Sequence, residues 1–158
     1  MTGRSVTRAT FGLERLYPAP PARVFAAWAD PAAKARWFAG AAAEHELDFR
    51  VGGREVNRGR HEEGTALTYT SVYHDIVTDE RIVYSSILHA GKNLSTVSLT
   101  TVEFGPDGEG TRLLLTEQAT FLDGREEPAW REQGTADWLE GLGAELLRGA
   151  PGEPGGRG

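Results

Sequence analysis

The chain has 158 residues, no cysteine, 39% hydrophobic residues and a formal net charge of −6 at pH 7. This length suits one domain that can bury a core, and the lack of cysteine excludes disulfides, thiolate metal sites and Cys nucleophiles. The acidic balance argues against a nucleic-acid partner, which would need a basic face. No apolar run reaches the roughly 20 residues of a membrane span, and no secretion signal follows Met1, so we expect a cytoplasmic protein without membrane insertion.

The N-terminal part predicts one strand and two short helices. Val6–Tyr17 alternates loosely between apolar and polar residues, and a proline-rich stretch that cannot continue a strand follows it. One of those prolines begins a helix, where the missing N–H costs nothing. Asp30-Pro31 ends that helix and caps a second one, which Gly40 ends.

From residue 44 to residue 122 the hydrophobic pattern has a period of two, which is typical of strands. Short turns rich in Gly, Asp and Glu separate successive stretches, so the strands must form an antiparallel meander. The predicted strands are His45–Val51, Arg54–Arg60, Thr65–Val77, Arg81–His89, Ser95–Phe104 and Thr111–Phe121.

The segment Glu127–Leu147 predicts a long amphipathic helix, because Trp130, Gly134, Trp138 and Leu142 are spaced four residues apart. Its apolar face needs a cover, and a strongly curved sheet is the partner that the chain provides. The sequence therefore predicts one α+β domain over residues 6–148, with the sheet wrapped around the C-terminal helix. We expect the Gly- and Pro-rich residues 149–158 to form a flexible tail.

Several motifs occur in an order found in one known family. Asp30-Pro31 precedes Trp37-Phe38, residues 48–53 read D-x-R-x-G-G, and residues 110–117 read G-T-x-L-x-L-T-E. Over about residues 10–147 the chain resembles the START-like (SRPBCC) superfamily and its helix-grip fold. Within that superfamily it resembles the AHSA family, named after the activator of a heat-shock chaperone ATPase. Phe38 departs from the family pattern, in which a second Trp is usual.

The resemblance implies a hydrophobic cavity between the long helix and the sheet. Members of the superfamily bind lipids, sterols or polyketides there, and a minority catalyse cyclisation or hydrolysis. We therefore expect non-enzymatic binding of a small hydrophobic molecule, whether lipid, sterol-like or polyketide-like aromatic, with no cofactor. A cyclase- or hydrolase-type enzyme and a chaperone-associated interaction module remain alternatives, and a homodimer stays open.

The residues expected around the cavity come from the second short helix, one face of the sheet and one stripe of the long helix. Gly134 would either leave room for a ligand or permit close packing. The strand residues depend on a choice of parity, since a shift of one residue would turn the opposite set inward. The predicted ligand-binding residues are Trp37, Phe38, Tyr69, Tyr73, Tyr84, Leu115, Glu117, Trp130, Gly134, Trp138 and Leu142.

Catalytic and metal motifs are weak in this sequence, so we assign no catalytic residue and no metal ligand. Glu117 is the candidate general base if it lies inside, with Arg50 or a tyrosine hydroxyl as its partner; a solvated surface position is the simpler interpretation. No G-x-S-x-G motif is present, which argues against a Ser hydrolase. The histidines lack zinc-site spacing and are interpreted as structural or surface residues: His45, His61, His74 and His89.

Overall fold

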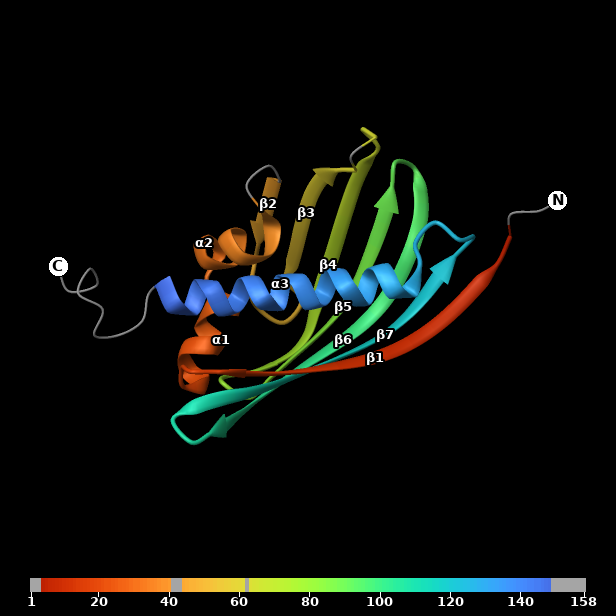
Figure 1. Ribbon diagram of the computed structural model, residues 1–158. Helices are drawn as coiled ribbons and strands as arrows, with labels where there is room; N and C mark the ends of the chain where they lie inside the picture. The colour runs from red at the N-terminus through yellow and green to blue at the C-terminus, as the bar shows by residue number, and fades with distance from the viewer. Residues whose placement is uncertain (1–3, 41–43, 62, 149–158) are drawn as a thin grey trace.

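The computed structural model describes residues 4–40, 44–61 and 63–148, so the predicted tail at residues 149–158 lies outside the described residues. The seven strands form one antiparallel sheet in the order β1-β7-β6-β5-β4-β3-β2 (Figure 1). The strands are β1 (Val6–Tyr17), β2 (Glu44–Leu47), β3 (Arg54–Arg60), β4 (Ala66–Val77), β5 (Arg81–Ala90), β6 (Asn93–Asp107) and β7 (Gly110–Leu122).

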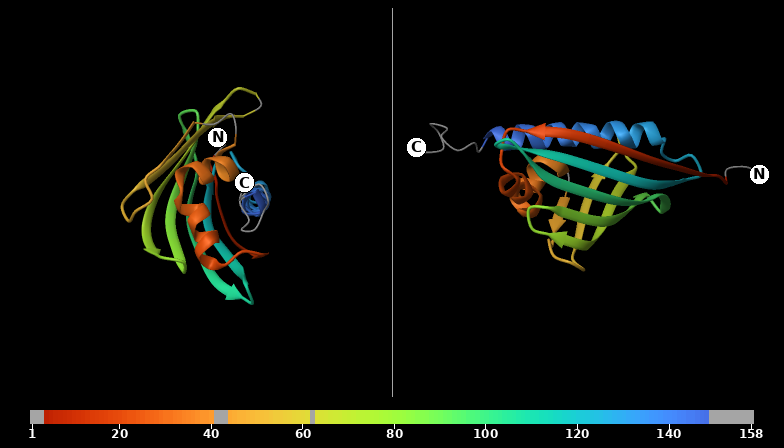
Figure 2. Two further views of the ribbon diagram at one scale, coloured as in Figure 1. Left: turned by 90° about the vertical axis from the view of Figure 1, so that its left-hand side faces the viewer. Right: turned by 90° about the horizontal axis from the view of Figure 1, so that it is seen from below.

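The helices cover one side of this sheet. The long helix α3 (Pro128–Arg148) crosses the concave side, while α1 (Pro21–Ala29), α2 (Pro31–Lys34) and the π-helix η1 (Ala35–Ala39) gather near one end (Figure 2). Pro21 stands at the first position of α1, where its missing N–H has no helical partner to lose. The predicted helix-grip arrangement is therefore confirmed.

The predicted strand His45–Val51 is too long, because β2 ends at Leu47 and the chain then turns back. The Gly53 N–H donates to the Arg50 carbonyl at 2.8 Å, and the Asp48 N–H donates to the Arg54 carbonyl at 2.8 Å. A Cβ atom at Gly53 would lie only 2.1 Å from the Asp48 carbonyl oxygen, so glycine is required. The D-x-R-x-G-G motif thus forms a tight turn rather than the end of a strand.

The core fills the space between the end of the sheet that carries α1 and the C-terminal half of α3. Trp28 is fully buried there and meets Trp37 edge to face at 4.9 Å between ring centroids. The Tyr17 hydroxyl donates to the Leu139 carbonyl at 2.8 Å and so ties β1 to α3. The predicted strand parity is confirmed by burial, since the inward set includes Tyr73, Tyr84, Leu115 and Glu117.

Candidate ligand-binding site

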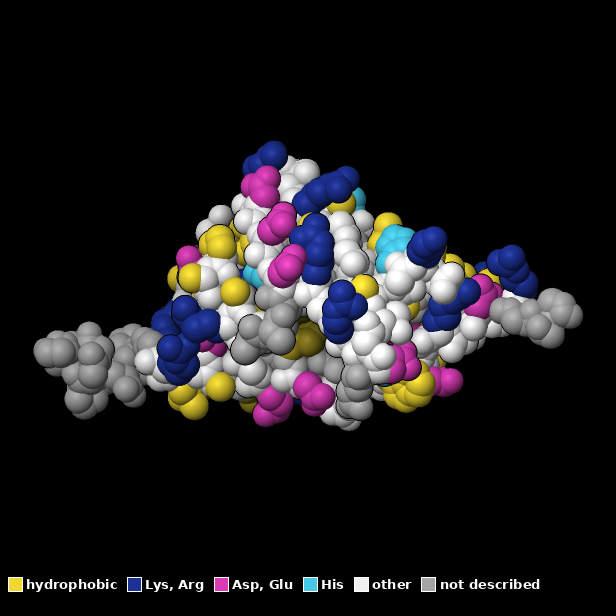
Figure 3. All heavy atoms as spheres, turned by 90° about the horizontal axis from the view of Figure 1, so that it is seen from above, with side chains coloured by type: hydrophobic (Ala, Val, Ile, Leu, Met, Phe, Trp, Pro, Cys, Tyr) yellow, Lys and Arg dark blue, Asp and Glu magenta, His cyan; other side chains and the backbone are white. Residues whose placement is uncertain are grey.

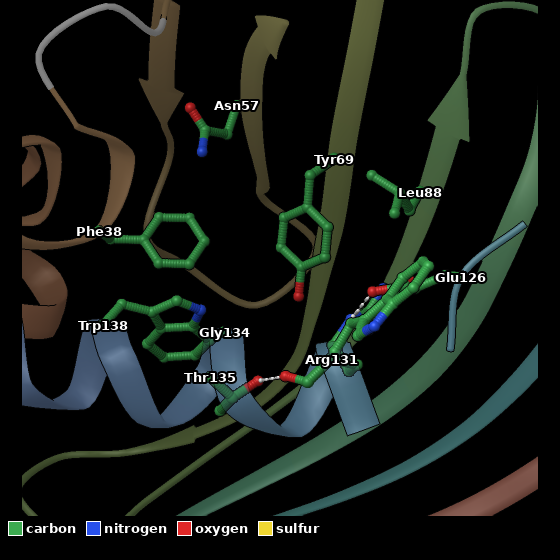
Figure 4. Close-up of a pocket in the computed structure, with 10 residues that line it drawn as sticks. Phe38, Asn57, Tyr69, Leu88, Glu126, Arg131, Gly134, Thr135 and Trp138 are labelled. Carbon is green, nitrogen blue, oxygen red and sulfur yellow. Dashed lines mark hydrogen bonds and ion pairs between the residues drawn. The ribbon is translucent and has the colours of Figure 1, made fainter. Parts of the chain in front are cut away.

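A cavity of about 220 Å³ lies between the N-terminal half of α3 and strands β3, β4 and β5 (Figure 4). Aromatic and apolar side chains make most of its wall, and a few polar groups interrupt them. The lining residues are Phe38, Asn57, Tyr69, Leu88, Glu126, Trp130, Arg131, Gly134, Thr135 and Trp138.

Gly134 keeps this space open on the helix side. A Cβ atom built at Gly134 would meet no atom within 4 Å, whereas one at Gly141 would lie 2.9 Å from the Trp37 carbonyl oxygen. The two glycines are seven residues apart, which is about two helical turns, and therefore face similar directions. Gly134 borders empty space, while Gly141 permits close packing of α3 against η1.

Aromatic rings from η1, β4 and α3 form much of the cavity wall. Phe38 meets Trp138 edge to face at 5.0 Å between ring centroids and lies 6.0 Å from Tyr69. Burial, together with the nearby Glu117 carboxylate, raises the pKa of Tyr69 to about 12. The Tyr69 hydroxyl is uncharged at neutral pH, as it would already be at the ordinary tyrosine pKa of 10.

A buried ion-pair cluster forms one side of the cavity. Arg131 on α3 contacts Glu117 at 2.6 Å and Glu126 at 2.9 Å, and the Thr96 hydroxyl donates to Glu126 at 2.5 Å. Burial would lower the pKa of Arg131, but its interactions with Tyr69, Glu117 and Glu126 outweigh burial and raise it. Two carboxylates surround one guanidinium, so the cluster carries a net negative charge.

This cluster corrects the interpretation of Glu117. A surface position was the simpler expectation, yet Glu117 is only 2% exposed. Its partner is Arg131, and neither Arg50 nor a tyrosine hydroxyl takes that place. Arg50 instead bonds Asp48 in the exposed turn after β2.

A second buried hydrogen-bond network lies next to the Phe38 ring. Glu55 accepts from the Lys34 ammonium and from the Tyr73 hydroxyl at 2.8 Å each, and its other oxygen lies 2.7 Å from His45 Nε2. The Lys34 ammonium also lies 4.6 Å from the centroid of the Phe38 ring. Burial alone would raise the pKa of Glu55, but Lys34 and the hydrogen bonds outweigh it and lower the pKa to about 2.

A neighbouring cavity of about 230 Å³ shares Leu88, Glu126 and Trp130 with the first. Trp130 is 64% exposed although it borders both spaces. Figure 3 looks onto this side of the molecule and shows hydrophobic side chains recessed at its centre, with basic and acidic side chains interspersed around them. The site is therefore accessible from solvent near the start of α3.

The structure brings five of the predicted ligand-binding residues together around the first cavity: Phe38, Tyr69, Trp130, Gly134 and Trp138. The other six do not border it, because their side chains pack or bond within the core: Trp37, Tyr73, Tyr84, Leu115, Glu117 and Leu142. The Trp37 indole, for example, donates to the Ala27 carbonyl at 2.9 Å.

The sequence reasoning missed five lining residues: Asn57, Leu88, Glu126, Arg131 and Thr135. Arg131 and Thr135 stand seven and three residues before Trp138 on the inward stripe of the helix, so helical spacing could have found them. Asn57 shares strand parity with the buried Glu55, which was also a usable signal.

Two kinds of feature are absent from the described residues. These residues include no group of three or more His, Asp and Glu side chains arranged to hold a metal ion. None of the helices in residues 4–40, 44–61 and 63–148 combines the length and apolar character needed to cross a membrane.

The curved sheet, the long helix and the cavity between them define a START-like module, a class whose fold supports ligand binding or association with a chaperone. The family model described as "Activator of Hsp90 ATPase homolog 1-like protein" matches residues 18–146. Because this match spans most of the chain, the chain belongs to that family. No curated protein matches the chain in sequence.

Solved structures of bacterial proteins share this fold. A putative uncharacterized protein from Rhizobium leguminosarum has 42% sequence identity and a TM-score of 0.89, and the similarity covers 93% of this chain and 99% of that one. The Mll3558 protein from Rhizobium loti has 48% identity and a TM-score of 0.85, covering 90% and 99%. Protein CV1439 from Chromobacterium violaceum has 27% identity and a TM-score of 0.72, covering 85% and 94%.

Proposed function

We propose that this chain is a non-enzymatic protein that binds a small hydrophobic ligand between the N-terminal half of α3 and the sheet. The observation that carries the proposal is the empty space beside Gly134, walled by Phe38, Tyr69 and Trp138. An apolar ligand gains about 25 cal/mol of binding free energy for each Å² of its surface that moves from water into such an aromatic cavity.

The volume narrows the range of ligands. A dry apolar cavity of roughly 150 Å³ already accepts benzene, so the cavity of about 220 Å³ suits a body of one or two rings or a short acyl chain. A complete sterol is too large for this space alone. The neighbouring cavity beyond Trp130 offers room for an extension of the same molecule.

Binding without catalysis is favoured by the state of the titratable groups. A general base needs a carboxylate or imidazole that can reach the substrate and accept its proton. Glu117 and Glu126 are both bonded to Arg131, and Glu55 is bonded to Lys34, His45 and Tyr73. These carboxylates already serve as partners for buried donors.

The variant Gly134→Leu tests the proposal, because its side chain would occupy the cavity. We expect ethylbenzene, used as a probe and followed by NMR titration, to bind the natural chain and to lose at least tenfold in affinity in the variant. The control Gly143→Ala adds a methyl group to the same helix at ordinary contact distance, 3.5 Å from the Tyr17 ring, and should bind as the natural chain does. Equal affinity in all three proteins would contradict the proposal.

A further inference from the structure

The ion-pair cluster at the cavity wall contains more negative than positive charge. Among the described residues that line the cavity, Arg131 is the one basic side chain. It contacts two carboxylates, Glu117 at 2.6 Å and Glu126 at 2.9 Å. Glu117 is 2% exposed and Arg131 is 9% exposed, so water can compensate little of the remaining charge. Because an uncompensated charge away from water costs free energy, the cluster would gain from one more cation.

The Tyr69 hydroxyl reports the sign of the electrostatic potential inside the cavity. Burial is the largest cause of its raised pKa, about 12, and beyond burial Glu117 raises the pKa more than Arg131 lowers it. In Figure 4 this hydroxyl lies between the rings of Phe38 and Trp138 on one side and the ion pair on the other. A ligand in this space would therefore meet a negative potential.

The aromatic wall also suits a cation. A ring presents a negative face, which attracts a positive charge within about 6 Å of its centroid. The chain already shows this contact once, since the Lys34 ammonium lies 4.6 Å from the centroid of the Phe38 ring. Lys34 does not balance the cluster, because it is paired with Glu55 at 2.8 Å. The aromatic residues that line the cavity are Phe38, Tyr69, Trp130 and Trp138.

A ligand carboxylate would meet the opposite conditions. It would face the negative sides of the rings and a cluster whose guanidinium is already bonded to two carboxylates. Like charges in a partly desolvated site repel strongly. The same wall thus attracts a cation and disfavours fatty acids and other anions.

We propose that the ligand of this cavity is an organic cation, a protonated amine carried on an apolar body of about one ring. Its ammonium group lies near Glu126, which borders both cavities, and its apolar body lies against Phe38 and Trp138 in the space beside Gly134. This inference rests on the proposed function, since it concerns the same cavity. It adds the positive charge of the ligand, which neither the fold nor the family match specifies.

Three probes that share one phenyl ring and differ in charge test the inference: benzylammonium, a cation; benzyl alcohol, its neutral counterpart; and benzoate, an anion. Dissociation constants come from ¹H–¹⁵N NMR titrations of the full chain at pH 7. We expect benzylammonium to bind at least tenfold more tightly than either of the other two. A smaller preference would overturn the inference, and binding of ethylbenzene would then leave the proposed function standing. If ethylbenzene and all three probes fail to bind, both are overturned.

A matched pair of variants tests whether the cluster is the source of the preference. Glu126→Gln removes one negative charge at the cavity and leaves Glu117 to pair with Arg131. The control Glu127→Gln makes the same change in net charge at the next residue, which is exposed and lines neither cavity. Glu126→Gln should reduce the preference for benzylammonium over benzyl alcohol at least threefold, and the control should keep it. A smaller reduction, or an equal one in the control, would overturn the inference. If Glu126→Gln fails to fold, the comparison of the three probes on the natural chain still decides.

Discussion

The two halves of the buried face of α3 differ in what lies opposite them. The C-terminal half presents Leu139, Leu142 and Leu146, each at most 3% exposed, to a solid core. The N-terminal half presents Gly134 and Trp138 to an open cavity. The C-terminal half of the helix therefore packs in the core, whereas its N-terminal half borders the cavity in which we propose that a ligand binds. Substitutions in the packed region should lower stability, whereas substitutions at the cavity should change binding.

The largest expected effect comes from breaking the buried network at Glu55. Glu55→Gln leaves the Lys34 ammonium buried without its counter-charge, and breaking one partner of a buried ion pair costs roughly 3–5 kcal/mol. Urea unfolding at pH 7 would measure the loss. The control Glu46→Gln breaks an exposed pair with Arg58 and should cost less than about 1 kcal/mol. Similar losses in both variants would contradict the role given to Glu55.

The same network predicts that the free energy of unfolding depends on pH in the acidic range. The pKa of Glu55 is lowered from 4.5 to about 2 in the folded chain, so its contribution is complete above the unfolded-state pKa. That contribution, on the order of 3 kcal/mol, should be lost as the pH falls from about 4.5 toward 2. Unfolding free energies measured across this range would show the decline, and Glu55→Gln should remove this part of it. An equally steep decline in the variant would assign the acid sensitivity to other groups.

Replacing each of two α3 glycines, Gly134 and Gly141, with alanine should change stability less, but it compares the two halves of the helix directly. Gly141→Ala forces a methyl group against the Trp37 carbonyl, and such overpacking costs roughly 1–3 kcal/mol. Gly134→Ala meets no atom within 4 Å and should stabilise the helix by up to about 1 kcal/mol. Thermal unfolding of both variants would measure the difference. Stability changes of the same sign in both variants would show that the two glycines have similar surroundings.

The sequence predicted the fold well because its signals are local. Alternating residues in β4, β5 and β7 marked the inward face, and short turns required antiparallel neighbours. Residues 48–51 were misassigned as strand because apolar alternation continues through Phe49 and Val51, while the fold there depends on the backbone of Gly53.

The site was harder to predict, because it depends on how side chains from distant segments meet. Helical spacing identified Gly134 and Trp138, but the pairing of Glu117 with Arg131 requires the relative position of α3 and β7. Equally, no sequence pattern states whether an inward aromatic residue fills the core or borders a void. Trp37 and Trp138 look alike in sequence, yet the first packs with its indole bonded to Ala27 and the second lines the cavity.

The most direct test of the account is a crystal of the protein pressurised with xenon, which binds in the apolar parts of cavities. The account predicts a xenon atom in the space bordered by Phe38, Gly134 and Trp138, and none between Gly141 and Trp37. A site beside Gly134 that excludes xenon because the chain's own side chains fill it would contradict the central claim that α3 leaves room for a guest.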